Sequence, residues 1–250
     1  MYNLIADLHT HTIASTHAYS TIKEMAVSAR DKGLYALAIT DHSSPMPGGP
    51  GPWYFSNLRN SVPLYYMDVM ILAGIEANVI DFNGTIDLDP IIDAPRLDWV
   101  VASIHDVGFE GILNPDIEKC TSLWLGAAKN PRINVIGHSG DPKFAYDYER
   151  VIPEFGANGK LVEINAHSFE VRKQNIENCR QIALLCKKHA VPIVVNSDAH
   201  FETQIADFSS ALKLLEEINF PEELIINSSQ KRLHDYLEKY SPIFNRNLPK

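Results

Sequence analysis

Seven short apolar runs, spaced along the chain, restrict the fold more than any other feature of the sequence. Each run has the length of a strand, is rich in valine and isoleucine, and is apolar on both faces, as strands buried in a parallel sheet are. The runs are residues 4–8, 36–40, 69–75, 99–104, 133–136, 161–164 and 191–195. Helical patterns separate several of them, and this alternation predicts an α/β protein built from right-handed βαβ units.

Helices are predicted between the runs, and the first has clear boundaries. It begins at Thr21, which forms a capping box with Glu24, and it ends at Gly33. The other predicted helices are residues 117–129, 173–189, 207–218 and 230–239. Seven strands in 250 residues predict one domain, residues 1–250, that closes as a barrel. An open doubly wound sheet is the alternative, although no strand is followed by a glycine-rich phosphate loop.

The segment 45–52 interrupts this pattern. Seven of its eight residues, P-M-P-G-G-P-G-P, are proline or glycine, so it is expected to be neither helix nor central strand. Trp53, Tyr54 and Phe55 follow directly. Two interpretations are open: a surface loop that packs its aromatic residues into the core, or a semi-rigid lid over a functional site.

Charge and cysteine content restrict the partners and the compartment. The chain carries 22 Lys and Arg against 31 Asp and Glu, a net charge of −9, so nucleic acid is not expected as a partner. Cys120, Cys179 and Cys186 form no CxxC pair, and we expect reduced thiols, as in the cytoplasm. We identify no signal peptide and no apolar run of about 18 residues, so no membrane association is expected.

Metal-type ligands follow almost every strand-like run. These residues are His9, His11, His17, Asp41, His42, Glu76, His105, His138, Asp198 and His200. The carboxyl ends of barrel strands meet at one face, so these side chains are predicted to lie together. A lone histidine at a strand end is more often hydrogen-bonded, but His9 and His11 point the same way from one strand. The pattern therefore predicts a metal site, with His167 beside it facing the substrate.

The residues in this order resemble those of the PHP (polymerase and histidinol phosphatase) superfamily. The matching motifs are Asp7-Leu-His9-Thr-His11, Thr40-Asp41-His42, Gly74-Ile-Glu76, Gly137-His138 and Ser197-Asp198-Ala-His200. The stretch Ala14-Ser-Thr-His-Ala-Tyr-Ser20, with Gly74-Ile-Glu-Ala-Asn78 and His138-Ser-Gly-Asp-Pro-Lys143, is similar to the YcdX-type phosphatases. The resemblance implies a distorted, TIM-like (β/α)7 barrel that holds three zinc ions.

The resemblance also implies how the ligands are divided among the ions. His9, His11, Glu76 and Asp198 would hold the first ion. Glu76, His105 and His138 would hold the second, and His17, His42 and His200 the third. Imidazole and carboxylate ligands without thiolate suit zinc, and they also suit iron or manganese.

The function that this resemblance implies is hydrolysis of small phosphomonoesters by a metal-bound hydroxide. Glu76 and Asp198 would hold the metal pair, while His17, His42 and His200 would hold an ion that binds the phosphoryl oxygens. Arg172, Arg59 and His167 are predicted to bind substrate, and Asp41 to orient a histidine. Three alternatives are a histidinol-phosphate phosphatase, a PHP-type nuclease and a non-catalytic metal-binding regulatory module. The sequence makes no prediction of the oligomeric state.

Overall fold

Seven parallel strands form the frame of the computed structural model, which describes residues 2–89, 97–105, 115–171 and 173–245. In order around the sheet they are β1 (Ala6–Asp7), β2 (Ala36–Ile39), β4 (Val69–Asn78), β5 (Trp99–Ser103), β6 (Val135–Ile136), β7 (Leu161–Asn165) and β8 (Ile193–Asn196). All seven were predicted as apolar runs. A short strand that was not predicted, β3 (Tyr65–Tyr66), pairs antiparallel with β4.

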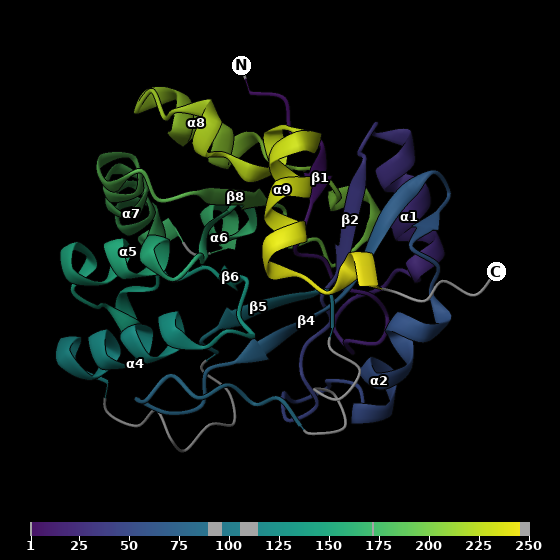
Figure 1. Ribbon diagram of the computed structural model, residues 1–250, viewed down its shortest axis with the longest axis horizontal. Helices are drawn as coiled ribbons and strands as arrows, with labels where there is room; N and C mark the ends of the chain where they lie inside the picture. The colour runs from purple at the N-terminus through teal and green to yellow at the C-terminus, as the bar shows by residue number, and fades with distance from the viewer. Residues whose placement is uncertain (1, 90–96, 106–114, 172, 246–250) are drawn as a thin grey trace.

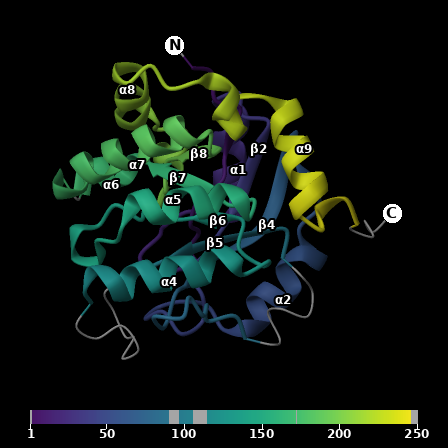
Figure 2. The same cartoon turned by 60° about the vertical axis from the view of Figure 1, so that its left-hand side comes forward.

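The helices lie outside the strands, with α4, α5 and α7 together along one flank (Figures 1 and 2). They are α1 (Ile22–Asp31), α2 (Pro52–Ser61), α4 (Ile117–Lys129), α5 (Tyr148–Ala157), α6 (Ala166–Val171), α7 (Ile176–His189), α8 (Ser209–Glu217) and α9 (Gln230–Tyr240). Five of these helices were predicted, whereas α2, α5 and α6 were not. No helix in the described ranges is long and apolar enough to cross a membrane.

Helix α9 closes the end of the barrel at which the strands begin (Figure 1). Its Leu233 and Leu237 are fully buried and pack into the same cluster as Trp99, whose indole donates to the carbonyl of Leu8 at 2.9 Å. The Tyr236 hydroxyl donates to the carbonyls of Asn134 and Gly159, which precede β6 and β7. The opposite, carboxyl end of the strands therefore remains for a functional site.

The barrel is closed by contacts between its first and last strands. At the carboxyl end, Thr10 forms a parallel bridge with Ala199, and the His11 amide donates to the Ala199 carbonyl at 2.8 Å. Lower down, the buried amide of Asn227 lies between β1 and β8. It donates to the carbonyls of Ala6 and Val195 and accepts from the Val195 amide. This closure confirms the barrel and excludes the open sheet.

Asn227→Ala is expected to destabilise the fold strongly. The substitution leaves the carbonyls of Ala6 and Val195 and the Val195 amide buried without partners, which costs roughly 3 kcal/mol in total. For a chain of this size, thermal denaturation should show a loss of about 6–12 °C in Tm. The matched control is Asn57→Ala on the exposed face of α2, expected within about 0.5 kcal/mol of wild type. Equal melting of the two variants would contradict this role.

Candidate metal centre

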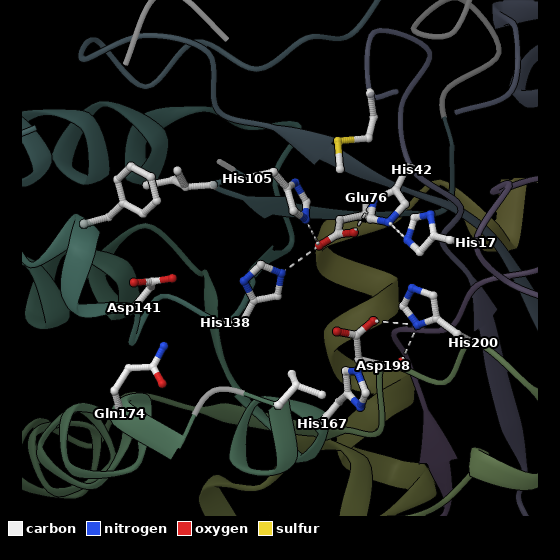
Figure 3. A pocket seen from close by; sticks show the side chains of 14 residues that line it. His17, His42, Glu76, His105, His138, Asp141, His167, Gln174, Asp198 and His200 are labelled. Atoms are coloured by element: carbon white, nitrogen blue, oxygen red, sulfur yellow. Dashed lines mark hydrogen bonds and ion pairs between the residues drawn. The ribbon is translucent and has the colours of Figure 1, made fainter. Parts of the chain in front are cut away.

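The carboxyl ends of the strands hold a dense cluster of histidines around one buried carboxylate, Glu76 of β4 (Figure 3). The Glu76 Oε1 atom lies 3.0 Å from Nε2 of His138 and 3.4 Å from Nε2 of both His9 and His105. The Oε2 atom lies 2.8 Å from His42 Nδ1. Four strand ends, those of β1, β2, β5 and β6, thus direct histidines at one glutamate.

A second carboxylate, Asp198, follows β8 and faces the histidines that follow β1. Its Oδ1 atom lies 3.1 Å from His11 Nε2 and 3.6 Å from His9 Nε2. The ring of His200 stacks on that of His11, with centroids 4.4 Å apart. The predicted His-x-His and Asp-x-His pairs therefore meet across the closure of the barrel.

His17 reaches the cluster from an exposed loop rather than from a strand end. Its Nε2 lies 3.1 Å from Nε2 of His42, and its ring stacks on that of His42 and lies tilted against that of His200. The loop is anchored by the Tyr19 amide, which donates to the His200 carbonyl at 2.9 Å. His17 is thus the most accessible of the predicted ligands.

The proline- and glycine-rich segment lies against this loop, since the Thr16 amide donates to the Gly48 carbonyl at 3.1 Å. Met46 lines the cavity above the cluster. Helix α2 then begins at Pro52, which the prediction for segment 45–52 assigned to loop; proline is tolerated in the first helical turn. Of the three aromatic residues, Phe55 is buried in the core, whereas Trp53 is 72% exposed.

The unsatisfied atoms of the cluster fit divalent cations. Nε2 of His9, both ring nitrogens of His11, Nδ1 of His42, Oε2 of Glu76 and Oδ1 of Asp198 are buried and, despite their close polar neighbours, make no hydrogen bond of acceptable geometry. Buried polar atoms are rarely left unpaired, because each costs free energy. Bound cations would satisfy one ring nitrogen of each histidine and both carboxylate oxygens, and zinc binds imidazole and carboxylate ligands.

Three groups of donor atoms are close enough to share an ion. One is His9, His11 and Glu76, another is His42, Glu76 and His105, and the third is His11, His42 and His200. The first contains three of the four ligands predicted for the first ion and lacks Asp198. The second contains His42 in place of the predicted His138. The third contains His11 in place of the predicted His17. His138 nevertheless lies 3.0 Å from Glu76, and His17 lies 3.1 Å from His42.

The pKa shifts of Glu76, Asp198, His11 and His17 suit metal binding, whereas at His9 and His42 the nearby carboxylates outweigh burial and raise the pKa. Burial opposes ionisation of Glu76 and Asp198, but the surrounding histidines hold the pKa of each carboxyl well below its ordinary value. Burial and the charge of His42 lower the pKa of His11 and of His17. Charged carboxylates and neutral imidazoles are the forms that bind cations.

Glu163 of β7 is a buried residue of the site that sequence reasoning missed. Its Oε1 lies 2.8 Å from His9 Nδ1, and its Oε2 accepts from the His138 backbone amide at 2.8 Å. A carboxylate on one ring nitrogen turns the other toward the metal position. The signal in the sequence was an acidic residue inside an otherwise apolar run.

Two further polar side chains support the cluster in different ways. Asn78 Oδ1 lies 2.6 Å from His105 Nδ1 and so fixes that ring. Asp41 was predicted to orient a histidine, and this is wrong. Its carboxylate accepts instead from Thr12, Ser15 and Tyr54, and so ties the His17-bearing loop to α2.

Two of the candidate ligands have a strained backbone. His138 has φ of 23° and Asp198 has φ of 57°, in the left-handed region that side chains with a Cβ rarely adopt. A Cβ at the preceding Gly137 would lie 2.2 Å from Ser103 Oγ, so the chain there passes close to β5. A strained backbone of this kind persists where many surrounding contacts hold it in place, as they do at functional sites.

Comparison with known proteins agrees with this geometry. The PHP domain family matches residues 7–167, which is more than half of the chain. The chain belongs to the PHP family. A probable phosphatase of Acetivibrio thermocellus is 43% identical over 94% of this chain and 95% of its own length. A probable phosphatase of Clostridium botulinum is 40% identical over 98% of both chains. These PHP relatives support the predicted phosphoric monoester hydrolase.

The fold of the PHP chain also has a solved counterpart. Histidinol phosphate phosphatase of Lactococcus lactis, crystallised with zinc, L-histidinol and phosphate, superposes with a TM-score of 0.60 at 18% identity. The match covers 86% of this chain and 94% of that one. At this identity the likeness concerns the fold, and it confirms the predicted barrel.

The predicted substrate-binding residues of this PHP protein have different positions. His167 lines the cavity, and its ring stacks on that of His200 at 6.0 Å. Arg59 does not line it; its guanidinium donates to Asp98, which precedes β5 at the other end of the barrel, at 2.8 Å. Arg172 lies outside the described residues.

Proposed function

We propose that this chain, acting as a single domain, hydrolyses small phosphomonoesters with three divalent ions, of which zinc is the first choice. The observation that carries the proposal is the group of six buried, unpaired donor atoms around Glu76 and Asp198. The relatives named phosphatases support the reaction, and the cavity of about 420 Å³ above the cluster fits a small ester.

The proposed division of ligands has three parts. His9, His11, Glu76 and Asp198 would hold one ion. Glu76, His105 and His138 would hold a second, with Glu76 bridging the two. His17, His42 and His200 would hold a third near the cavity mouth, which the exposure of His17 supports.

Bound divalent ions supply a nucleophile from water near neutral pH and positive charge for the phosphoryl oxygens. The chain's own side chains provide the positioning. Glu163 keeps the proton of His9 on Nδ1, and Asn78 orients His105 through its Nδ1. His167 and Met46 line the cavity where an ester would lie.

Two of the alternatives differ in what they require of the site. A nuclease needs a basic surface for the phosphate backbone, whereas this chain has a net charge of −9. The described lining of the cavity, moreover, contains no lysine or arginine. A non-catalytic module would tolerate lost ligands, but all nine predicted positions carry metal-binding side chains.

Elemental analysis of protein purified without chelator is expected to find about three divalent ions per chain. The same protein should hydrolyse p-nitrophenyl phosphate, lose that activity in EDTA and regain it with zinc. A reproducible content of one ion or fewer would contradict the three-ion centre. Full activity in EDTA would contradict the reaction itself. Single-stranded DNA added as a competitor should leave the rate unchanged, whereas inhibition would favour the nuclease.

A further inference from the structure

The cavity has two chemically different ends. One end consists of the metal-binding residues around Glu76. Facing them across the cavity, Asp141 and Gln174 form the other polar end, as Figure 3 shows. Ile104, Phe144, Met46 and Val171 supply apolar lining. An ester bound with its phosphoryl group at the ions would therefore place its alcohol half toward Asp141.

Asp141 has a free acceptor that faces the cavity. Its Oδ1 accepts from the Lys143 amide at 2.9 Å, which caps the short helix η2 (Pro142–Phe144). The described contacts give Oδ2 no hydrogen bond within the protein. Gln174, in η3 (Lys173–Asn175), adds an amide that both donates and accepts. Together they offer a carboxylate and an amide to one ligand group.

No cation balances Asp141 among the described residues that line the cavity. The ammonium of Lys143 lies over the Phe144 ring, 5.5 Å from its centroid, and is not part of that lining. A second acidic group on the alcohol half would thus face a carboxylate. A hydroxyl or an ammonium group there would instead donate to it.

We infer that Asp141 selects the alcohol half of the substrate, favouring small phosphomonoesters with further hydroxyl or ammonium groups and rejecting those with a second acidic group. This inference rests on the proposed function, because it takes the phosphoryl group to lie at the ions. Asp141 acts as a specificity determinant, with Gln174 completing the contact. The metal ligands determine which bond is hydrolysed, and the Asp141 end of the cavity determines which alcohol group is accepted.

The test compares two esters that differ at one carbon. Glycerol 3-phosphate ends in a hydroxymethyl group where 3-phosphoglycerate ends in a carboxylate. The zinc-loaded full chain is expected to prefer glycerol 3-phosphate by about tenfold or more in kcat/KM, because the carboxylate of 3-phosphoglycerate would lie beside a like charge. In Asp141→Asn the preference should fall to within about threefold, mainly because 3-phosphoglycerate improves. Inhibition by inorganic phosphate should stay within about twofold, since phosphate binds at the other end.

A matched control is available six residues along the chain. Asp147 also caps a helix, accepting from the Arg150 amide at 3.1 Å, but it does not line the cavity. Asp147→Asn should keep the wild-type preference, and asparagine caps as well as aspartate at either position. Asp141→Ser, which also retains a cap, serves if the first variant does not fold.

The outcomes separate the inference from the proposed function. An unchanged preference in both Asp141 variants, with hydrolysis intact, would overturn the inference alone. A wild type that prefers 3-phosphoglycerate would do the same. A zinc-loaded wild type that hydrolyses neither these esters nor p-nitrophenyl phosphate would overturn the proposed function, and the inference with it.

Discussion

Glu76→Gln is expected to lose at least one ion and nearly all activity. Five histidines lie within 3.6 Å of this carboxylate: His9, His11, His42, His105 and His138. The amide keeps the shape but removes the charge that lets two cations lie close together in a poorly hydrated site. We expect kcat/KM to fall by about 1,000-fold or more, which corresponds to roughly 4 kcal/mol of barrier.

Elemental analysis and steady-state hydrolysis of p-nitrophenyl phosphate measure this effect. The control is Glu118→Gln, whose exposed carboxylate pairs with Arg150 at 3.3 Å and should change neither ion content nor rate. His17→Ala provides the contrast within the site, since His17 shares no donor set with the proposed pair. It should lose one ion, keep two and turn over more slowly. Three ions in this variant, or none, would refute the proposed division.

Glu163→Gln is expected to weaken metal binding without removing any ligand. The carboxylate accepts from four donors: His9 Nδ1, the His138 amide and the side chains of Asn165 and Asn196. Glutamine has one oxygen, so its own NH2 group would meet two donors with no acceptor between them. Residues that orient metal-binding histidines typically contribute 10- to 100-fold in metal affinity, and we expect a loss of about that size.

Competition with a chelator of known zinc affinity measures this loss directly. Activity at saturating zinc should recover partly, which separates a positioning role from a direct catalytic one. The Glu118→Gln control should match wild type in both measurements. If Glu163→Gln bound zinc within about threefold of wild type, the carboxylate would have only a structural role.

The strands could be predicted because burial on both faces leaves a direct record in the sequence. The same reasoning missed α5, whose pattern contains Pro153, and α2, which begins at a proline after a segment without helical residues. In both helices tertiary burial outweighs local preference: Phe55, Ile152 and Phe155 pack into the core. Local propensity is a weak guide where such packing decides.

The candidate ligands could be predicted because barrel topology brings strand ends together whatever their separation in sequence. The supporting residues could not be predicted in the same way. Nothing in the sequence shows that Glu163 contacts His9, or that Asp41 binds Tyr54 rather than a histidine. Arg59 looked available for phosphate but pairs with Asp98, a contact between residues 39 positions apart.

The closure between β1 and β8 also orders events in time. His9 and His11 leave the ribosome 189 residues before Asp198 and His200. A nascent chain therefore carries half of a binding site with nothing opposite it until the last strand docks. An ion bound by both halves would stabilise the contact between β1 and β8. By linkage, the free energy that the bound ion adds to closure equals the free energy that closure adds to binding of the ion. In metal-depleted cells the barrel would then open more often between β1 and β8. The amide hydrogens of His11 and Val195, which lie at this closure, would be the first to exchange with solvent.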